Sequence, residues 1–245
     1  MKACRVLPIA KAPQPNGHVA RSAETRARLI EAAIEVFGNF GLDGAGTRSL
    51  TDHAQVSLAA ISYHFGGKRE LFHAAAVCIA DYGTTLMDEI DEQLRLLPAT
   101  DIPQRIEQIT SLFCRAIIGG SEPQTWVDFF VRCGKEAPTE FDLIYSNIFG
   151  RFEGMLTRAI ASLNGGDPDD ETLRLRVTTI IAPIMAFRTN RQALLDRFHW
   201  PSLTPERIAK LETVILEAVR NNFLNLPPGI AMEGSPSGTL ITKEE

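Results

Sequence analysis

The sequence has few of the features that mark secreted or metal-binding proteins. It has four cysteines, Cys4, Cys78, Cys114 and Cys133. None stands in a Cys-x-x-Cys pair, and no histidine lies beside them at metal-ligand spacing. A disulfide framework or a zinc site is therefore not expected. We expect the last three cysteines to be free thiols on helices.

Long apolar runs are also missing. The mean hydropathy is −0.03, and each apolar stretch is short and interrupted, so we expect no membrane-spanning segment and no membrane partner. The first residues do not read as a secretory signal, because Pro8, Pro13 and Pro15 would break its apolar segment. A cytoplasmic location is the resulting expectation.

Catalytic patterns are missing as well. We find no nucleophile–base pair, metal-ligand cluster or paired carboxylates, so no catalytic residue, metal or cofactor is predicted. His53 and His73 are interpreted as surface or packing histidines. The glycine-rich stretch 41–46 resembles a phosphate loop, but no strand precedes it and no Gly-Lys-Ser/Thr closes it. A helical enzyme, or a helical adaptor that does not bind DNA, is the alternative kept open.

Charge is unevenly distributed along the chain. The net charge of −5 argues against indiscriminate binding to nucleic acid. Residues 1–75 nevertheless carry nine Lys/Arg and six Asp/Glu, a balance of +3, whereas residues 76–245 carry sixteen and twenty-four, a balance of −8. A basic N-terminal part fits contact with phosphates, although many proteins that bind none show such a bias.

Helical periodicity dominates from Glu24 onward, without convincing strand alternation, so we predict an all-α fold of about nine helices. Apolar residues from Ile30 to Phe37 recur at helical spacing, and Gly38 and Gly41 are expected to end this first helix. The other helices are predicted at about 48–54, 58–65, 68–97, 102–118, 123–136, 139–163, 169–197 and 205–225.

The two short helices have the pattern of a helix-turn-helix at about residues 47–68. Leu50 and Ala54 lie one turn apart on the first helix, and Ile61 and Phe65 lie one turn apart on the second. With a valine in the turn between them, these residues would form an apolar wedge that locks the helices at a steep angle.

The outer face of the second short helix is suited to DNA. Ser57 is the expected N-cap, and the small residues that follow would let the backbone approach the major groove closely. Tyr63 and His64 can donate to phosphate oxygens, and Lys68 would place a charge at the height of the phosphates. The rival interpretation is a helical hairpin with a solvated polar face.

The stretches 54–57 (AQVS) and 61–68 (ISYHFGGK) resemble the TetR family of bacterial regulators, and the resemblance covers residues 24–75. It implies an N-terminal three-helix DNA-binding head, with a helix-turn-helix, on a helical domain for ligand binding and dimerisation. It also implies that the partner is double-stranded operator DNA with a palindromic sequence, bound by a homodimer.

The resemblance assigns roles to single residues. Tyr63, His64 and Lys68 match positions that contact phosphates. Thr47 and Arg48 match positions that reach DNA, and Arg48 can pair bidentately with a guanine. The groove-facing positions correspond to Ser57, Leu58, Ala59, Ala60 and Ser62.

The motif departs from the family pattern at three places. Gln55 stands where the family usually has a turn glycine, and a left-handed residue there would cost about 1 kcal/mol. The usual Lys-Gly opening of the second helix is replaced by Leu58-Ala59, and Ser62 replaces a common second tyrosine. These departures bear on which operator is read.

The C-terminal half resembles the CecR-like branch of the family, in residues 136–145 (EAPTEFDLIY), 182–188 (APIMAFR) and 198–201 (FHWP). We expect the last two long helices to pack against their twofold copies as a four-helix dimer interface, with ordinary core helices as the rival interpretation. The apolar residues expected in this interface are Val177, Ile180, Ile181, Ile184, Ile208, Leu211, Ile215, Ala218 and Val219.

Aromatic residues concentrate between residues 113 and 152, and rings that fill the core are the rival to a pocket. A ligand that favours the conformer with wrongly spaced heads would weaken DNA binding, with the helix 68–97 as the lever. The resemblance favours repression relieved by a small-molecule effector, with activation left open. The predicted pocket residues are Trp126, Phe129, Arg132, Cys133 and Tyr145.

Four regions result. We predict a flexible arm at 1–22, a helix-turn-helix DNA-binding domain at 23–70, an effector-binding and dimerisation domain at 71–226, and a disordered tail at 227–245. The arm either contacts the DNA backbone or has no role, and its basic residues are Lys2, Arg5, Lys11 and Arg21.

Overall fold

The computed structural model describes residues 17–98 and 101–224, and within these ranges the chain forms helices and no strand. The predictions for Lys2, Arg5, Lys11 and the tail 227–245 lie outside the described residues. The α-helices are α1 (Gly17–Gly44), α2 (Thr47–Ala54), α3 (Ala59–Phe65), α4 (Lys68–Leu96), α5 (Ile102–Gly119), α6 (Gln124–Glu136), α7 (Pro138–Tyr145), α8 (Arg151–Asn164), α9 (Glu171–Thr189), α10 (Arg191–Arg197) and α11 (Pro205–Val219), with π-helical segments η1 (Ser146–Gly150) and η2 (Arg220–Leu224).

The nine predicted helices are all present over these residues, and two of them are divided. The predicted helix 139–163 is interrupted by η1, where Ile148 packs so closely on Gly83 of α4 that a β-carbon on residue 83 would collide with it. The predicted helix 169–197 is interrupted at Asn190, whose side-chain amide donates to the Ala186 carbonyl at 3.2 Å. Each interruption of a predicted helix therefore coincides with a side chain that makes a close contact or a local hydrogen bond.

The start of α1 corrects the expected arm. Residues 17–22 belong to the helix, and so they are not part of a flexible arm that reaches residue 22. The last proline of the N-terminal segment is Pro15, and after Gly17, the first residue of α1, no glycine or proline follows before Gly38. Arg21, assigned to the arm, therefore lies on α1.

Gly38 and Gly41 have different roles in α1. Gly41 breaks the helix as predicted, with φ 74° and ψ 176°, a left-handed conformation that favours glycine. Gly38 was wrongly expected to end the helix; instead it lies within α1 and against α6. A β-carbon on Gly38 would lie 2.5 Å from the Thr125 carbonyl oxygen, so only glycine permits this approach.

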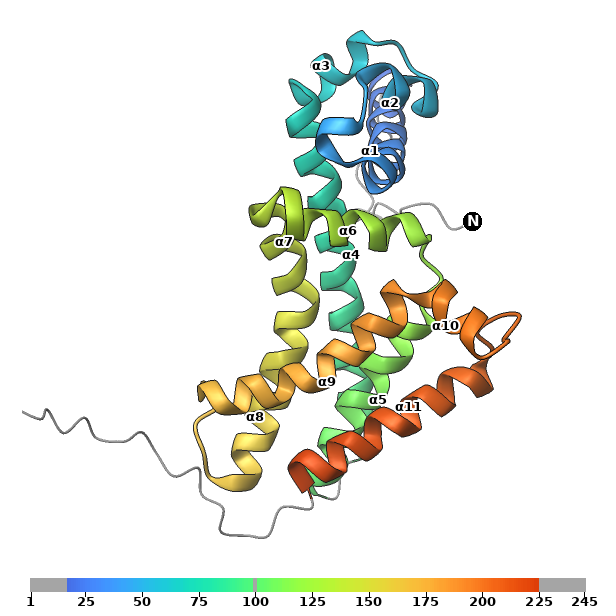
Figure 1. Cartoon of the computed structure of the whole chain (residues 1–245). Helices are drawn as coiled ribbons and strands as arrows, with labels where there is room; N and C mark the ends of the chain where they lie inside the picture. The colour runs from blue at the N-terminus through green and yellow to red at the C-terminus, as the bar shows by residue number, and fades with distance from the viewer. Residues whose placement is uncertain (1–16, 99–100, 225–245) are drawn as a thin grey trace, which may run out of the picture.

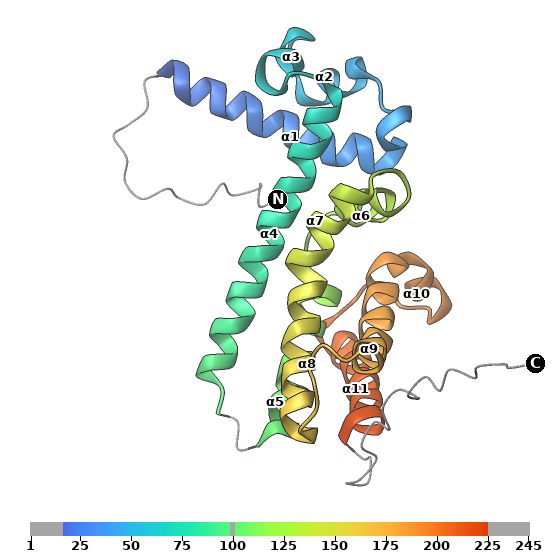
Figure 2. The ribbon, with the colours of Figure 1, turned by 90° about the vertical axis from the view of Figure 1, so that its left-hand side faces the viewer.

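The helices form an elongated molecule with a head and a body (Figure 1). Helices α1–α3 make up the head, and α4 runs from the head along the length of the body. Helix α6 crosses directly beneath the head. Seen from the side, α4 lies on one side of the body, with α9 and α11 on the opposite side (Figure 2).

Three fully buried phenylalanines join the head to the body. Phe37 of α1 packs edge-on against Phe72 of α4, with ring centroids 5.0 Å apart, and Phe72 packs on Phe129 of α6 at 4.8 Å. Burial of each ring contributes on the order of 2 kcal/mol, and paired rings add to this. We call the contact of α1, α4 and α6 around these rings the joint.

The apolar stripes expected at a dimer interface are mostly core of the protomer. The residues Val177, Ile180, Ile181, Ile184, Leu211, Ile215 and Val219 are all buried within a single chain, and Ile208 and Ala218 are half-buried. The rival interpretation as core helices therefore holds for the buried ones, since α9 and α11 pack on α5. What remains exposed is the other face of each helix.

We expect Gly38→Ala to lower the free energy of unfolding by about 1–3 kcal/mol, because the added methyl group would push α1 and α6 apart. Urea denaturation of the full chain measures this. Gly166→Ala is the matched control, since nothing lies within 4 Å of a β-carbon at that position. Equal midpoints for the two variants would contradict the close packing of α1 on α6.

Candidate DNA interface and effector cavity

The helix-turn-helix forms around the apolar wedge that the spacing predicted. Leu50 and Ala54 of α2 and Ile61 of α3 are buried, with Val56 and Phe65 half-buried against them. The predicted start of each helix lies within one residue of the observed one. The wedge fixes α3 relative to α2, so the outer residues of α3 are held on a rigid element.

The turn between α2 and α3 has the left-handed residue that the sequence suggested. Gln55 has φ 54° and ψ 49°. Its N–H donates to the Asp52 carbonyl at 3.2 Å, and the Val56 N–H donates to the Thr51 carbonyl at 3.0 Å. This is the hydrogen-bond pattern of a Schellman motif, in which glycine is the usual left-handed residue.

The outer face of α3 is exposed, with one exception among the predicted groove-facing residues. Leu58 is 53% exposed, and Ser57, Ala59 and Ser62 are exposed as well. Ala60 is only 8% exposed and belongs to the core of the head, so it adds little to this face. The face that remains is small and largely apolar.

Ser57 does not cap α3 as expected. The structure places the N-cap at Leu58, without a side-chain capping bond. Instead, the Ala60 N–H donates to the backbone carbonyl of Ser57 at 2.9 Å. Because Leu58 already has helical dihedral angles, the turn at Ser57 is closed by backbone atoms, which leaves its exposed side chain on the outer face.

The predicted phosphate-contacting residues lie at the end of α3 and the start of α4. Tyr63 is 75% exposed, and its ring packs edge-on against His64 with centroids 4.9 Å apart. Lys68 is half-buried, and its ammonium donates to the Ala45 carbonyl at 3.1 Å. This bond uses one of three N–H donors and holds the Lys68 ammonium at the surface of the head.

The candidate DNA-contacting surface also includes the start of α2 and one face of α1. Thr47 and Arg48 are both exposed. Thr25 and Arg28 of α1 border a hollow of about 450 Å³ together with Tyr63 of α3. Sequence reasoning missed α1 here, although residues 21, 25 and 28 share one face by helical spacing.

A second hollow lies inside the body and is the candidate effector cavity. Its volume is about 90 Å³, and most of its wall is apolar. Tyr82 of α4 and Trp126 of α6 meet edge-on at its side, with ring centroids 5.5 Å apart. The lining residues are Ile79, Tyr82, Leu86, Ile117, Glu122, Trp126, Val127, Phe130, Ile144, Ile148, Phe149, Met185, Arg188 and Thr189.

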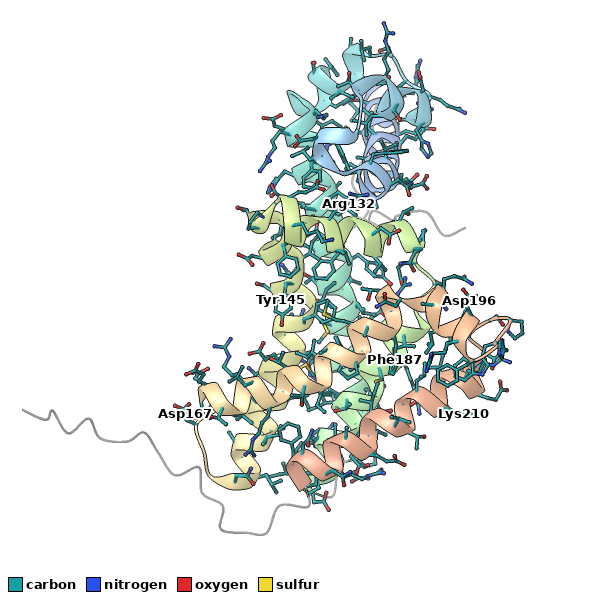
Figure 3. The ribbon with its side chains drawn as sticks, in the orientation of Figure 1. Arg132, Tyr145, Asp167, Phe187, Asp196 and Lys210 are labelled. Carbon is teal, nitrogen blue, oxygen red and sulfur yellow. The ribbon has the colours of Figure 1, made fainter. Side chains whose placement is uncertain are left out.

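Of the five residues predicted to line a pocket, Trp126 lines this cavity and the other four lie elsewhere. Phe129 and Cys133 are fully buried, Phe129 within the joint. Tyr145 stacks on Phe141, with ring centroids 5.6 Å apart, and lies tilted against Phe149 at 5.5 Å, as core packing. Arg132 points to the head (Figure 3).

Arg132 and Glu136, one turn apart on α6, clamp the break in α1. The Arg132 guanidinium donates to the Gly38 and Asn39 carbonyls at 2.7 and 2.6 Å. The Glu136 carboxylate accepts from the Leu42 N–H at 3.0 Å. Charge-assisted bonds of this kind contribute about 1.5–3 kcal/mol each when shielded, and less here, where both side chains are about one-third exposed.

Glycine at position 41 lets the clamp close. A β-carbon on Gly41 would lie 2.6 Å from one oxygen of the Glu136 carboxylate. The left-handed break and the close approach therefore both require glycine here. Together with the three phenylalanines, the clamp makes α6 part of the joint with the head.

The cavity has one polar end, built from three elements. The Tyr82 hydroxyl donates to the Glu122 carboxylate. Arg188 of α9 is 7% exposed, and its guanidinium donates to the Glu122 carbonyl at 2.9 Å and lies 3.9 Å from the Glu122 carboxylate. Burial lowers the pKa of Arg188 and, aided by Glu122, raises the pKa of Tyr82.

The three described cysteines form no disulfide, as expected, and each lies on a helix. Cys114 and Cys133 are buried, Cys78 is half-buried, and burial raises the pKa of the first two to about 12. These two thiols therefore stay protonated and pack as apolar groups.

Among residues 17–98 and 101–224, none of the helices has the length and apolar character that a membrane span requires.

Two family comparisons match this architecture. Residues 29–75 match the bacterial regulatory proteins of the tetR family, and residues 102–223 match the C-terminal domain of the HTH-type transcriptional dual regulator CecR. The chain is 30% identical to CecR of Shigella flexneri over 193 residues, which span 76% of this chain and 86% of CecR. The regulatory protein RaaS of Mycobacterium tuberculosis is 43% identical over 63 residues, 25% of this chain and 29% of RaaS.

Solved structures share the fold. A TetR-family regulator from Mesorhizobium loti superposes with a TM-score of 0.57 at 16% identity, covering 83% of this chain and 97% of that one. The regulator FadR of Bacillus subtilis, solved in complex with stearoyl-CoA, superposes with a TM-score of 0.54 at 15% identity, covering 78% and 95%.

We expect Gln55→Gly to raise the free energy of unfolding by up to about 1 kcal/mol, because glycine removes the steric cost of the left-handed conformation. Chemical denaturation measures the change. Asp52→Gly, in the helical part of α2, is the control and should destabilise by about 1 kcal/mol. Destabilisation by both variants would contradict strain at Gln55.

Proposed function

The chain belongs to the tetR family of bacterial regulatory proteins and is a DNA-binding transcription regulator; from this premise we propose a homodimeric repressor that an effector releases from a palindromic operator. The observation that supports this best is the joint. It connects the head that carries α3 to the same two helices, α4 and α6, that line the cavity.

In the proposed complex, α3 lies in the major groove and its flanks contact phosphates. The exposed Tyr63 lies near the end of α3, the half-buried Lys68 lies at the start of α4, and Arg48 lies at the start of α2. Phosphate contacts set the position of the head, and Arg48 supplies the contact with a base edge. The small residues Ser57, Ala59 and Ser62 allow the close approach.

The face of α1 with Arg21, Thr25 and Arg28 extends the phosphate-contacting surface. Thr25 and Arg28 border the hollow beside Tyr63 and His64, so a phosphate chain that passes α3 would also pass α1. DNA binding therefore uses more of the head than the helix-turn-helix alone.

The proposed dimer interface is the outer face of α9 and α11. Leu175 of α9 is 62% exposed and Val214 of α11 is 59% exposed. Thr178, Ala182 and Ala186 continue the face of α9 from Leu175 at helical spacing, and all three are exposed. Small and apolar residues on neighbouring helices suit packing against a twofold copy.

Effector binding must widen the cavity. Pockets for small molecules usually measure roughly 300–1,000 Å³, whereas this cavity measures about 90 Å³. A ligand would therefore push apart walls that include α4 and α6. Both helices also contribute a phenylalanine to the joint, Phe72 from α4 and Phe129 from α6. The conformer with displaced heads binds the ligand better, so by linkage the ligand weakens operator binding by the same factor.

Operator selection from genomic DNA tests the first part of the proposal, and the regulator should enrich a palindrome. Tyr63→Ala and Lys68→Ala should weaken binding to every sequence alike, and Lys68→Ala, which removes a positive charge, should also lower the salt dependence by about one ion. Arg48→Ala should instead relax the preference at one base pair, at a cost of about 1–3 kcal/mol.

Arg95→Ala is the control for these variants, because Arg95 is an exposed cation that lies near the end of α4 farthest from the head. It should leave operator binding unchanged. The absence of any enriched palindrome would support the alternatives, a helical enzyme or an adaptor without DNA binding. Equal loss on all sequences with Arg48→Ala would remove its base-reading role.

Leu175→Glu should weaken dimerisation at least tenfold, because it places an unpaired carboxylate in the proposed interface. Sedimentation velocity over a concentration series measures the dissociation constant. Leu96→Glu is the matched control, since Leu96, which is 75% exposed, is a leucine at the end of α4, away from α9 and α11. An unchanged dimer with Leu175→Glu would place the interface elsewhere.

A further inference from the structure

The polar end of the cavity contains a buried positive charge beside an apolar space. Arg188 is more than nine-tenths buried and lines the cavity with Trp126 and Phe130. A guanidinium out of water is stable only with acceptors around it, and a planar carboxylate satisfies its N–H groups with two parallel bonds. The nearest carboxylate, that of Glu122, lies 3.9 Å from the Arg188 guanidinium, too far for such bonds, and the guanidinium donates instead to the Glu122 backbone carbonyl and the Gln124 side chain.

The Glu122 carboxylate is the more exposed member of this ion pair. Its side chain is 22% exposed, compared with 8% for Arg188, and it lies in the connection between α5 and α6. Its carboxylate lies over Gly120, where a β-carbon would collide with it. Glu122 can therefore rotate toward water, whereas Arg188 is held between the Glu122 carbonyl and Gln124.

We propose that the effector is an apolar molecule with one carboxylate, which replaces the Glu122 carboxylate at Arg188 while its apolar part occupies the cavity. This inference rests on the proposed function, since it names the ligand class of the same cavity. A positively charged ligand would face Arg188 at close range. It would have to pair with Glu122, whose carboxylate already accepts from Tyr82.

The same exchange reaches the head. The Glu122 carboxylate accepts from the Tyr82 hydroxyl of α4 and lies 3.9 Å from the Arg188 guanidinium of α9, so it connects the two helices. A ligand carboxylate that takes Arg188 breaks this connection and leaves Tyr82 to find another acceptor. Tyr82 lies on the helix that carries Phe72 of the joint, so the loss of this bond frees α4 to move.

Three probes with one skeleton test the ligand class: 3-phenylpropanoate, 3-phenylpropanamide and 3-phenylpropylamine, which are anionic, neutral and cationic at neutral pH. Isothermal titration calorimetry on the full chain measures their affinities. The carboxylate should bind at least tenfold more tightly than either analogue. Equal affinities, or preference for the amine, would overturn the inference.

Two variants test the two sides of the exchange. Arg188→Gln should bring the affinity for the carboxylate to within twofold of that for the amide, with Arg197→Gln, an exposed arginine of α10, as the matched control. Glu122→Gln keeps an oxygen for the Tyr82 hydroxyl and removes the competing charge. It should bind the carboxylate at least threefold more tightly, and an unchanged or weaker affinity would overturn the displacement.

Operator binding by the same samples without probe separates this inference from the proposed function. If the protein without substitutions binds no operator, the proposed function is contradicted. The probe affinities would still decide the ligand class. If the protein binds the operator, and the amide or the amine weakens this binding while the carboxylate does not, the proposed function holds. The inference that the effector is a carboxylate is then overturned.

Discussion

The contact of α1 with α6 is the constraint on which the other parts of the structure depend. Phe37, Phe72 and Phe129 fill its centre, and Arg132 and Glu136 close its edge. Without it, α4 would be the main connection between the head and the body. With it, the head is held at two places, and its position responds to the angle between α4 and α6.

The two helices that hold the head also form walls of the cavity. Helix α4 contributes Tyr82 to the cavity and Phe72 to the joint, about three turns apart. Helix α6 contributes Trp126 to the cavity and Phe129 to the joint, less than one turn apart. A change of cavity shape therefore reaches the joint along two short, rigid paths that need no flexible element.

The sequence predicted the local structure of the head well, because its signals are local. The wedge of Leu50, Ala54 and Ile61 follows from spacing within a dozen residues, and the left-handed Gln55 follows from one position in a turn. The break at Gly41 could be predicted for the same reason. The candidate DNA-contacting residues remain predictions, although most of them lie on the exposed surface.

The body was harder to predict, because periodicity shows that a helix face is apolar but not what covers it. The stripes from Val177 to Ile184 and from Ile208 to Val219 are mostly buried within the same chain, where α9 and α11 pack on α5. Arg132 was assigned to a pocket from its aromatic neighbours, whereas its partner Gly38 lies 94 residues away. The polar pair of the cavity, Glu122 and Arg188, gave no sequence signal.

The clamp of the joint binds only backbone atoms of the head: the carbonyls of Gly38 and Asn39 and the N–H of Leu42. These groups are the same whatever side chains α2 and α3 carry. Substitutions that change the DNA sequence read by the head would therefore leave its attachment to the body intact. The side chains on the surface of α2 and α3 can therefore vary without altering the bonds that attach the head to the body.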